Sequence, residues 1–213
     1  MTEFGSSSAN IPRQQITALI LAGGQARRMG GVAKGLQLLA GRPLVAHIAE
    51  KIRPAVGPLW ISANQYQADY ANYADKVIAD LNSDYAGPLA AWQAGLSVCT
   101  TPWLLSLPCD CPDFPADLCQ RLSASAQQHP ARLSYACATE LHQSRAHPVF
   151  ALIHRQHLRA LNDYLISGQR RVMSWLESQQ ACPVLFEDKS AFENLNTLEQ
   201  LQQKNQSYDK RST

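Results

Sequence analysis

Short apolar runs alternate along the chain with segments whose apolar residues recur at helical spacing. The runs have the composition of buried strands and cover residues 17–22, 59–63, 76–79, 103–107, 133–138 and 149–153. Two segments between them, 43–52 and 87–98, place large apolar side chains on one face of a helix, and Pro88 suits a first helical turn. The pattern therefore predicts strands and helices in alternation.

Such alternation predicts an α/β domain with a Rossmann-like, mostly parallel central sheet and helices on both faces. In sheets of this kind, ligands bind beyond the carboxyl ends of the strands. Four segments are therefore expected at one edge of the sheet: the glycine-rich loop after residue 22, Asn64, the turn after Asp80 and the turn around Asp110.

The two ends of the chain depart from this pattern. Residues 1–13 are polar and rich in Ser, and residues 205–213 are polar, so we expect a flexible leader and a polar tail around one domain, residues 14–204. The leader lacks the charged and apolar regions of a secretory signal. No apolar run approaches the roughly 20 residues that a membrane-spanning helix needs.

Charge and cysteine content narrow the class of partner. The 213 residues carry a formal net charge of +2, so we expect no broad basic surface for nucleic acid or for membranes. Six cysteines without a secretory signal favour reduced thiols in a cytoplasmic protein. Cys109 and Cys111 lack the C-x-x-C spacing of zinc sites, and we interpret them as small buried thiols.

The stretch LAGGQARRMGGVAKGL, residues 21–36, carries the strongest chemical signal. It matches neither the phosphate loop G-x-x-x-x-G-K-[ST] nor the dinucleotide fingerprint G-x-G-x-x-G. Its glycines still allow backbone N–H groups to approach an anion, and Arg27, Arg28 and Lys34 add positive charge. Several such contacts suit a triphosphate, whereas the alternative is a solvated loop whose glycines merely turn the chain.

This loop resembles the L-A-G-G-x-x-x-R-M-G signature of nucleotidyltransferases, and further motifs narrow the family. They are GPLAA from residue 87, LPCDCP from 107, RAHPVFAL from 145, GQRRVM from 168 and NLNT from 194. In this order they resemble the molybdenum cofactor guanylyltransferases, which join GMP from GTP to molybdopterin. The resemblance spans residues 16–201. The first motif alone is shared with cytidylyl and sugar-phosphate relatives.

The resemblance implies a site in two halves and a bound Mg²⁺. It implies Arg28, Lys34 and Asp110 as catalytic residues, with Asp110 as the magnesium ligand. It implies GTP contacts at Leu21, Ala22, Gly23, Gly24, Lys34, Asn64, Asp80, Gly87 and Asp110. It implies molybdopterin contacts at Arg145, His147, Arg170, Arg171, Asn194 and Asn196. The implied partners beyond the substrates are molybdoenzyme apoproteins and the proteins that load them.

Several of these residues also have plainer interpretations. Asp110, Asn64 and Asp80 all lie in turn-forming sequences and could simply bond their own backbone. His147 could be a packed structural histidine, and adjacent helical residues such as Arg170 and Arg171 point about 100° apart, so only one of them is expected to reach a ligand. Asp113 is interpreted as the residue that begins the helix after it.

One departure from the family's pattern leaves the activity open. The family usually has Asp before the loop lysine, and this chain has Ala33. An acidic residue there would orient the lysine or touch the metal's surroundings, so its loss bears on metal affinity or rate. The alternatives to the guanylyltransferase are a molybdopterin cytidylyltransferase, a sugar-phosphate nucleotidyltransferase, or a carrier that binds molybdopterin without turnover.

Overall fold

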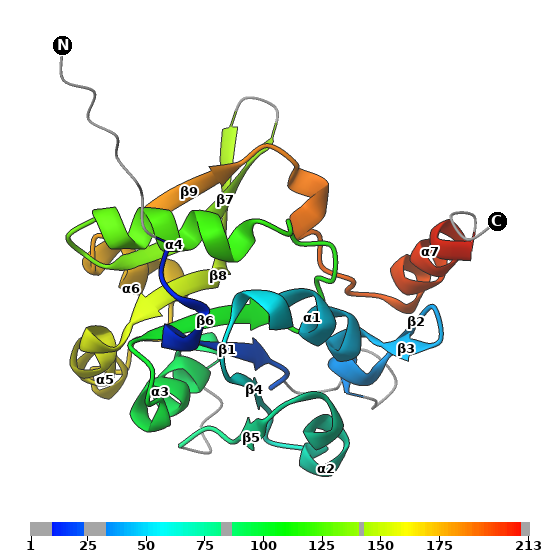
Figure 1. Cartoon of the computed structure of the whole chain (residues 1–213), viewed down its shortest axis with the longest axis horizontal. Coiled ribbons are helices and arrows are strands. Elements are labelled where there is room, and N and C mark those ends of the chain that lie inside the picture. The colour runs from blue at the N-terminus through cyan, green and yellow to red at the C-terminus, as the bar shows by residue number, and fades with distance from the viewer. Residues whose placement is uncertain (1–9, 24–32, 82–86, 141–142, 210–213) are drawn as a thin grey trace.

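The computed structural model describes residues 10–23, 33–81, 87–140 and 143–209, and a seven-stranded sheet forms its centre (Figure 1). The strand order is β5-β4-β1-β6-β8-β7-β9, and a separate two-stranded sheet pairs β2 with β3. The strands are β1 Ile16–Leu21, β2 Leu38–Leu39, β3 Arg42–Pro43, β4 Leu59–Ser62, β5 Lys76–Ile78, β6 Trp103–Pro108, β7 Leu133–Glu140, β8 Gln143–His154 and β9 Cys182–Phe186. All neighbouring pairs of the large sheet are parallel except the two that involve β8.

Helices cover both faces of this sheet. The α-helices are α1 Leu44–Ile52, α2 Gln67–Tyr70, α3 Pro88–Val98, α4 Leu118–Gln128, α5 Leu158–Ile166, α6 Val172–Ser178 and α7 Leu198–Asp209. The short 3-10 helices are η1 Arg13–Gln15, η3 Lys34–Leu36, η4 Arg53–Ala55, η5 Ala71–Tyr73, η6 Arg155–His157 and η7 Lys189–Phe192. Of the helices in the described ranges, none is both long and apolar enough to cross a membrane.

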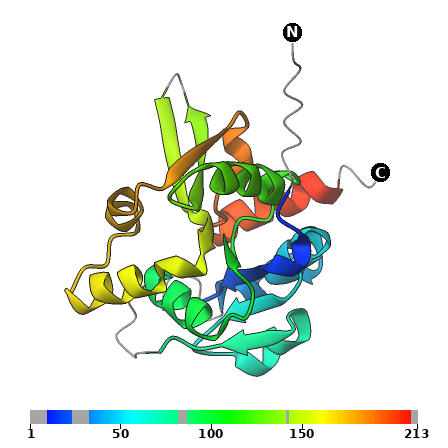
Figure 2. The same ribbon diagram turned by 60° about the vertical axis from the view of Figure 1, so that its left-hand side comes forward.

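The side-chain alternation of the strands builds one core on each face. In β6, Leu105 and Leu107 join a cluster that contains the buried faces of α1 and α4, whereas Leu104 joins the cluster of α3, α5 and α6. Figure 2 shows α3 and α5 side by side on that second face. Ser106, on the same face, accepts a 2.7 Å hydrogen bond from the Trp92 indole. Because both faces are buried, the central strands β1 and β6 are apolar over most of their length, as the sequence indicates.

The predicted α/β class and the mostly parallel sheet are confirmed. All six predicted runs are strands, and the helices expected in 43–52 and 87–98 are α1 and α3. The apolar pattern did not predict β9, the β2–β3 pair or the antiparallel direction of β8. At the ends, Ile11 of the expected leader is buried and α7 runs to Asp209, so regular structure extends beyond residues 14–204.

The interpretation of Asp113 as a helix-starting residue is wrong. Helix α4 begins at Leu118, and the residue that precedes it is Asp117. Asp113 instead forms an ion pair with Lys204 of α7. A charge partner 91 positions away in the sequence is invisible to a local capping rule, which considers only the next turn of the chain.

Candidate active site

The carboxyl ends of four adjacent strands form one edge of the sheet, as expected. Three backbone hydrogen bonds join them: Ala63 N donates to Ile78 O at 2.9 Å, Ala22 N donates to Ser62 O at 2.9 Å, and Cys109 N donates to Leu21 O at 3.2 Å. Leu21 and Ala22 are half-buried where β1 ends, and Gly23 is exposed beyond them. The start of the glycine-rich loop therefore lies between the turns that follow β4 and β6.

Asn64 and Asp80 bond to each other at this edge. Asn64 Nδ2 donates to Asp80 Oδ2 at 2.9 Å, and Asp80 N donates to Asn64 Oδ1 at 2.9 Å. The amide thus fixes the backbone and the carboxylate of the neighbouring turn together. The structure brings both predicted GTP contacts to the expected edge, and it also gives each a structural partner.

Gly87 begins α3 next to the same edge. Its φ of +67° and ψ of −150° lie in a region that is essentially restricted to glycine, and Pro88 follows as the first helical residue. This backbone lets α3 start abruptly at Pro88. Gly87 is exposed, and no atom of the described residues lies within 4 Å of the position that a Cβ atom there would occupy.

Lys34 and Asp110 form an ion pair in front of the strand ends. Asp110 follows β6, and its side chain is 12% exposed, whereas that of Lys34 is 28% exposed. Asn196 Oδ1 accepts a second hydrogen bond from Lys34 Nζ at 2.6 Å. A largely buried carboxylate costs several kcal/mol unless a cation compensates it, so the ammonium group offsets the charge of Asp110 here.

The residues beside Asp110 and Lys34 are apolar or neutral. Burial raises the pKa of both the Cys109 and the Cys111 thiol to about 12, and the charge of Asp110 contributes in the same direction. The interpretation of these cysteines as buried thiols is confirmed. Ala33, where the family usually has Asp, is 7% exposed and precedes the η3 turn that carries Lys34. The residue directly before the lysine therefore carries no charge.

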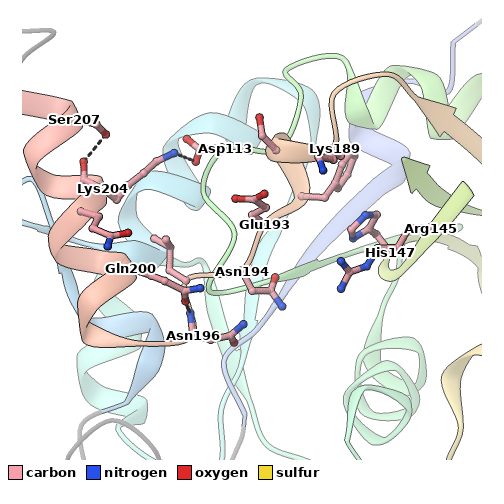
Figure 3. A pocket seen from close by; sticks show the side chains of 14 residues that line it. Asp113, Arg145, His147, Lys189, Glu193, Asn194, Asn196, Gln200, Lys204 and Ser207 are labelled. Atoms are coloured by element: carbon pink, nitrogen blue, oxygen red, sulfur yellow. Dashed lines mark hydrogen bonds and ion pairs between the residues drawn. The ribbon is translucent and has the colours of Figure 1, made fainter. Parts of the chain in front are cut away.

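A cavity of about 470 Å³ lies beside this pair, between β8, η7 and the start of α7 (Figure 3). Its lining is mostly polar and consists of Asp113, Arg145, His147, Lys189, Ser190, Phe192, Glu193, Asn194, Leu195, Asn196, Gln200, Gln203, Lys204 and Ser207. Arg145 and His147 come from β8 and face the α7 residues across it (Figure 3). Asn196 belongs both to this lining and to the contacts of Lys34.

The cavity unites four of the six predicted molybdopterin contacts: Arg145, His147, Asn194 and Asn196. The His147 ring stacks on Phe192, with centroids 4.8 Å apart and planes 23° apart, so this histidine is packed as well as cavity-lining. Sequence reasoning missed Lys189, Gln200 and Lys204. The cavity-lining residues of α7 belong to a polar helix, which gives no apolar periodicity to identify it.

The structure does not bring Arg170 and Arg171 to this cavity. Both lie in the connection between α5 and α6, and the Arg170 guanidinium donates to the Leu165 and Gln169 carbonyls at 2.8 and 2.7 Å. Neither arginine is inside a helix, so the argument from helical spacing does not apply to them. The predicted residues Gly24, Arg27 and Arg28 lie outside the described residues.

Similarity to known proteins identifies the family to which this chain belongs. The model of the MobA-like NTP transferase domain matches residues 18–204. A molybdenum cofactor guanylyltransferase from Cupriavidus taiwanensis is 42% identical over 192 residues, which cover 90% of this chain and 96% of the relative. One from Ralstonia nicotianae is 41% identical over 198 residues, which cover 91% and 97%.

Solved structures agree on the fold. Molybdopterin-guanine dinucleotide biosynthesis protein A from Archaeoglobus fulgidus superposes with a TM-score of 0.69 at 20% identity, covering 91% of this chain and 99% of that one. A 4-diphosphocytidyl-2C-methyl-D-erythritol synthase from Anaerococcus prevotii superposes with a TM-score of 0.72 at 10% identity, covering 92% and 96%. With the matches in sequence, these findings show that the chain belongs to the MobA-like NTP transferase family and is a nucleotidyltransferase of the molybdenum cofactor guanylyltransferase group.

Proposed function

We propose that the chain transfers GMP from GTP to the terminal phosphate of molybdopterin, in a reaction that needs Mg²⁺ and takes place in the cytoplasm. The observation that supports this most directly is the Lys34–Asp110 pair at the strand ends, next to a cavity that carries Arg145, His147, Asn194 and Asn196. The pair suits a metal–triphosphate, and the polar cavity suits an acceptor with a phosphate and a polar ring system.

The reaction needs two substrates held in line. An oxygen of the acceptor's phosphate forms a bond to the α-phosphorus of GTP, while the bond from that phosphorus to the pyrophosphate oxygen breaks. No covalent enzyme intermediate is required, so the protein contributes positioning and charge neutralisation. Lys34 would contact the triphosphate and stabilise the negative charge that grows on the leaving pyrophosphate. Arg28 would add a second positive charge from the glycine-rich loop.

Asp110 fits the role of the magnesium ligand. Its carboxylate is a hard oxygen donor at the edge where the phosphates would lie, and it already carries a cation, the Lys34 ammonium group. Mg²⁺ keeps most of its water and commonly uses one or two carboxylates together with substrate phosphates. A magnesium ion bound at Asp110 would neutralise negative charge on the phosphates.

The GTP side of the site would be lined by Leu21, Ala22, Gly23, Gly24, Asn64, Asp80 and Gly87. Molybdoenzyme apoproteins, or the proteins that load them, would receive the product.

Pyrophosphate release tests this function. With Mg²⁺ and molybdopterin present, we expect release with GTP and little with CTP, ATP or UTP. Turnover with CTP would support nucleotidyl transfer but show that the chain is a cytidylyltransferase and not a guanylyltransferase. Turnover only with a sugar phosphate as acceptor would reassign the acceptor. Binding of GTP without release would favour a carrier, and the Ala33→Asp variant would then show whether the missing carboxylate is the cause.

Arg145→Ala is expected to raise the KM for molybdopterin by roughly tenfold, because a charge-assisted hydrogen bond contributes about 1.5–3 kcal/mol. The KM for GTP should stay within about twofold, since Arg145 lies on β8 in the cavity and not at the strand ends. The matched control is Arg159→Ala, an exposed arginine on α5 outside the cavity lining, whose kinetics should equal those of the unmodified protein. If Arg145→Ala left the KM for molybdopterin unchanged, the acceptor would have to bind outside this cavity.

A further inference from the structure

The Lys34 ammonium group is held by residues from two distant parts of the chain. Asp110 belongs to the turn after β6, whereas Asn196 lies 162 positions after Lys34, just before α7. A lysine donates hydrogen bonds and never accepts them, so the atom of Asn196 that faces it must be the carboxamide oxygen. The Nδ2 group of Asn196 therefore takes no part in holding the lysine.

The backbone around Asn196 is fixed by a reciprocal cap at the start of α7. Gln200 Oε1 accepts from Asn196 N at 2.7 Å and from Thr197 N at 3.1 Å, and Thr197 Oγ1 accepts from Gln200 N at 3.1 Å. This is the arrangement of a capping box, which satisfies N–H groups that a helix start leaves without partners. Asn196 is therefore presented by a rigid element.

The same segment is attached directly to the turn that carries Asp110. Leu195 N donates to the Asp110 carbonyl at 2.8 Å, and Lys204 of α7 forms an ion pair with Asp113. The Leu195 and Leu201 side chains pack with Leu39 and Leu44 in a small core cluster. The start of α7 thus has a set position relative to both Asp110 and Lys34.

We propose that Asn196 is a positioning residue for Lys34, in addition to lining the acceptor cavity. Its carboxamide oxygen holds the lysine ammonium where the triphosphate binds, and its place in the cavity lets acceptor binding and GTP binding influence each other through one side chain. This inference rests on the proposed function, because it takes the cavity as the acceptor's site and Lys34 as a triphosphate contact. Any such coupling is reciprocal: an acceptor that orders Asn196 tightens GTP binding by the factor by which GTP tightens acceptor binding.

Equilibrium binding of GTP with Mg²⁺, in the absence of acceptor, tests the proposal by calorimetry. Asn196→Ala is expected to weaken GTP binding about tenfold, at the lower end of what a hydrogen bond to a charged group contributes. In the Lys34→Met background the same substitution should cause no further loss, because Asn196 acts through the lysine. The substitution leaves the Asn196 N–H that Gln200 binds, so the thermal midpoint should be close to that of the unmodified protein.

The matched control is Gln202→Ala, which removes an exposed amide of α7 outside the cavity lining and should not change GTP affinity. Unchanged GTP affinity in Asn196→Ala, or losses that simply add in the double variant, would overturn the positioning role. Failure of the unmodified protein to bind GTP would count against the guanylyl function instead. The same single and double variants would then be measured with the nucleotide that does bind, and the same outcomes would support or overturn the positioning role of Asn196.

Discussion

The Asp110→Asn variant should release pyrophosphate at least about 10³-fold more slowly than the unmodified protein under saturating substrates. Loss of one preorganised charge-stabilising group typically costs 10²–10³ in rate, and Asp110 is also the proposed magnesium ligand. The variant keeps the shape of the side chain and the backbone carbonyl that Leu195 binds. A mere loss of folding is therefore not expected, and the midpoint of thermal unfolding checks this.

Single-turnover measurements over a range of Mg²⁺ concentrations separate a metal role from a purely electrostatic one. If Asp110 binds the metal, higher Mg²⁺ should partly restore the rate of Asp110→Asn. The control is Asp117→Asn, an exposed carboxylate before α4 whose side chain forms a 3.7 Å ion pair with Arg121 of α4. Activity of Asp110→Asn within tenfold of the control would show that the carboxylate is a turn former and not a metal ligand.

Lys34→Met should lower kcat/KM for GTP by about 10²–10³-fold, the second largest effect that we expect. A positive charge about 4 Å from a phosphate contributes roughly 4 kcal/mol at an effective dielectric constant of about 20, and solvent around the partly exposed lysine reduces this. The KM for molybdopterin should change less, because the lysine itself is not part of the cavity lining and contacts it through Asn196. Steady-state kinetics with each substrate varied in turn provide the measurement.

Two further variants serve as controls for Lys34→Met. Lys76→Met removes an exposed lysine of β5 whose ammonium group lies over the ring of Trp60 on β4. This variant should behave like the unmodified protein. Lys34→Arg keeps the charge, but a planar guanidinium fits a site built around a point charge poorly, so we expect partial activity. If Lys34→Met retained full kcat/KM for GTP, the triphosphate would have to be held by other groups, and the Lys34–Asp110 pair would be structural.

The expectations that held depended on local sequence patterns. The apolar runs at 103–107 and 149–153 became β6 and β8 because burial on both faces demands continuous apolar residues over a short length. Gly87 and Pro88 begin α3 because their backbone preferences suit a helix start. The gathering of Asn64, Asp80 and Asp110 followed from the parallel arrangement, since parallel strands place their carboxyl ends at one edge.

The features that the sequence did not place in the structure lacked such a local signal. β9, Cys182–Phe186, is a short edge strand that contains Pro183, and α7 is a polar helix whose position depends on contacts with β2 and with the turn after β6. The direction of β8 depends on the hairpin that joins it to β7, which the apolar pattern does not encode. Arg170 and Arg171 matched a motif, but a motif gives order along the chain and no location in space.

By itself, the sequence determined the α/β class, most of the sheet's strands and the edge at which Asn64, Asp80 and Asp110 gather. It did so because the spacing of apolar residues and the order of the strands along the chain can be read directly from the sequence. Only the tertiary structure decided that α7 lines the cavity, that Asn196 holds Lys34 and that Arg145 shares a cavity with Lys204. Those pairings join segments up to 162 residues apart, and packing of the whole chain, with its buried charges and helix caps, is what brings such segments into contact.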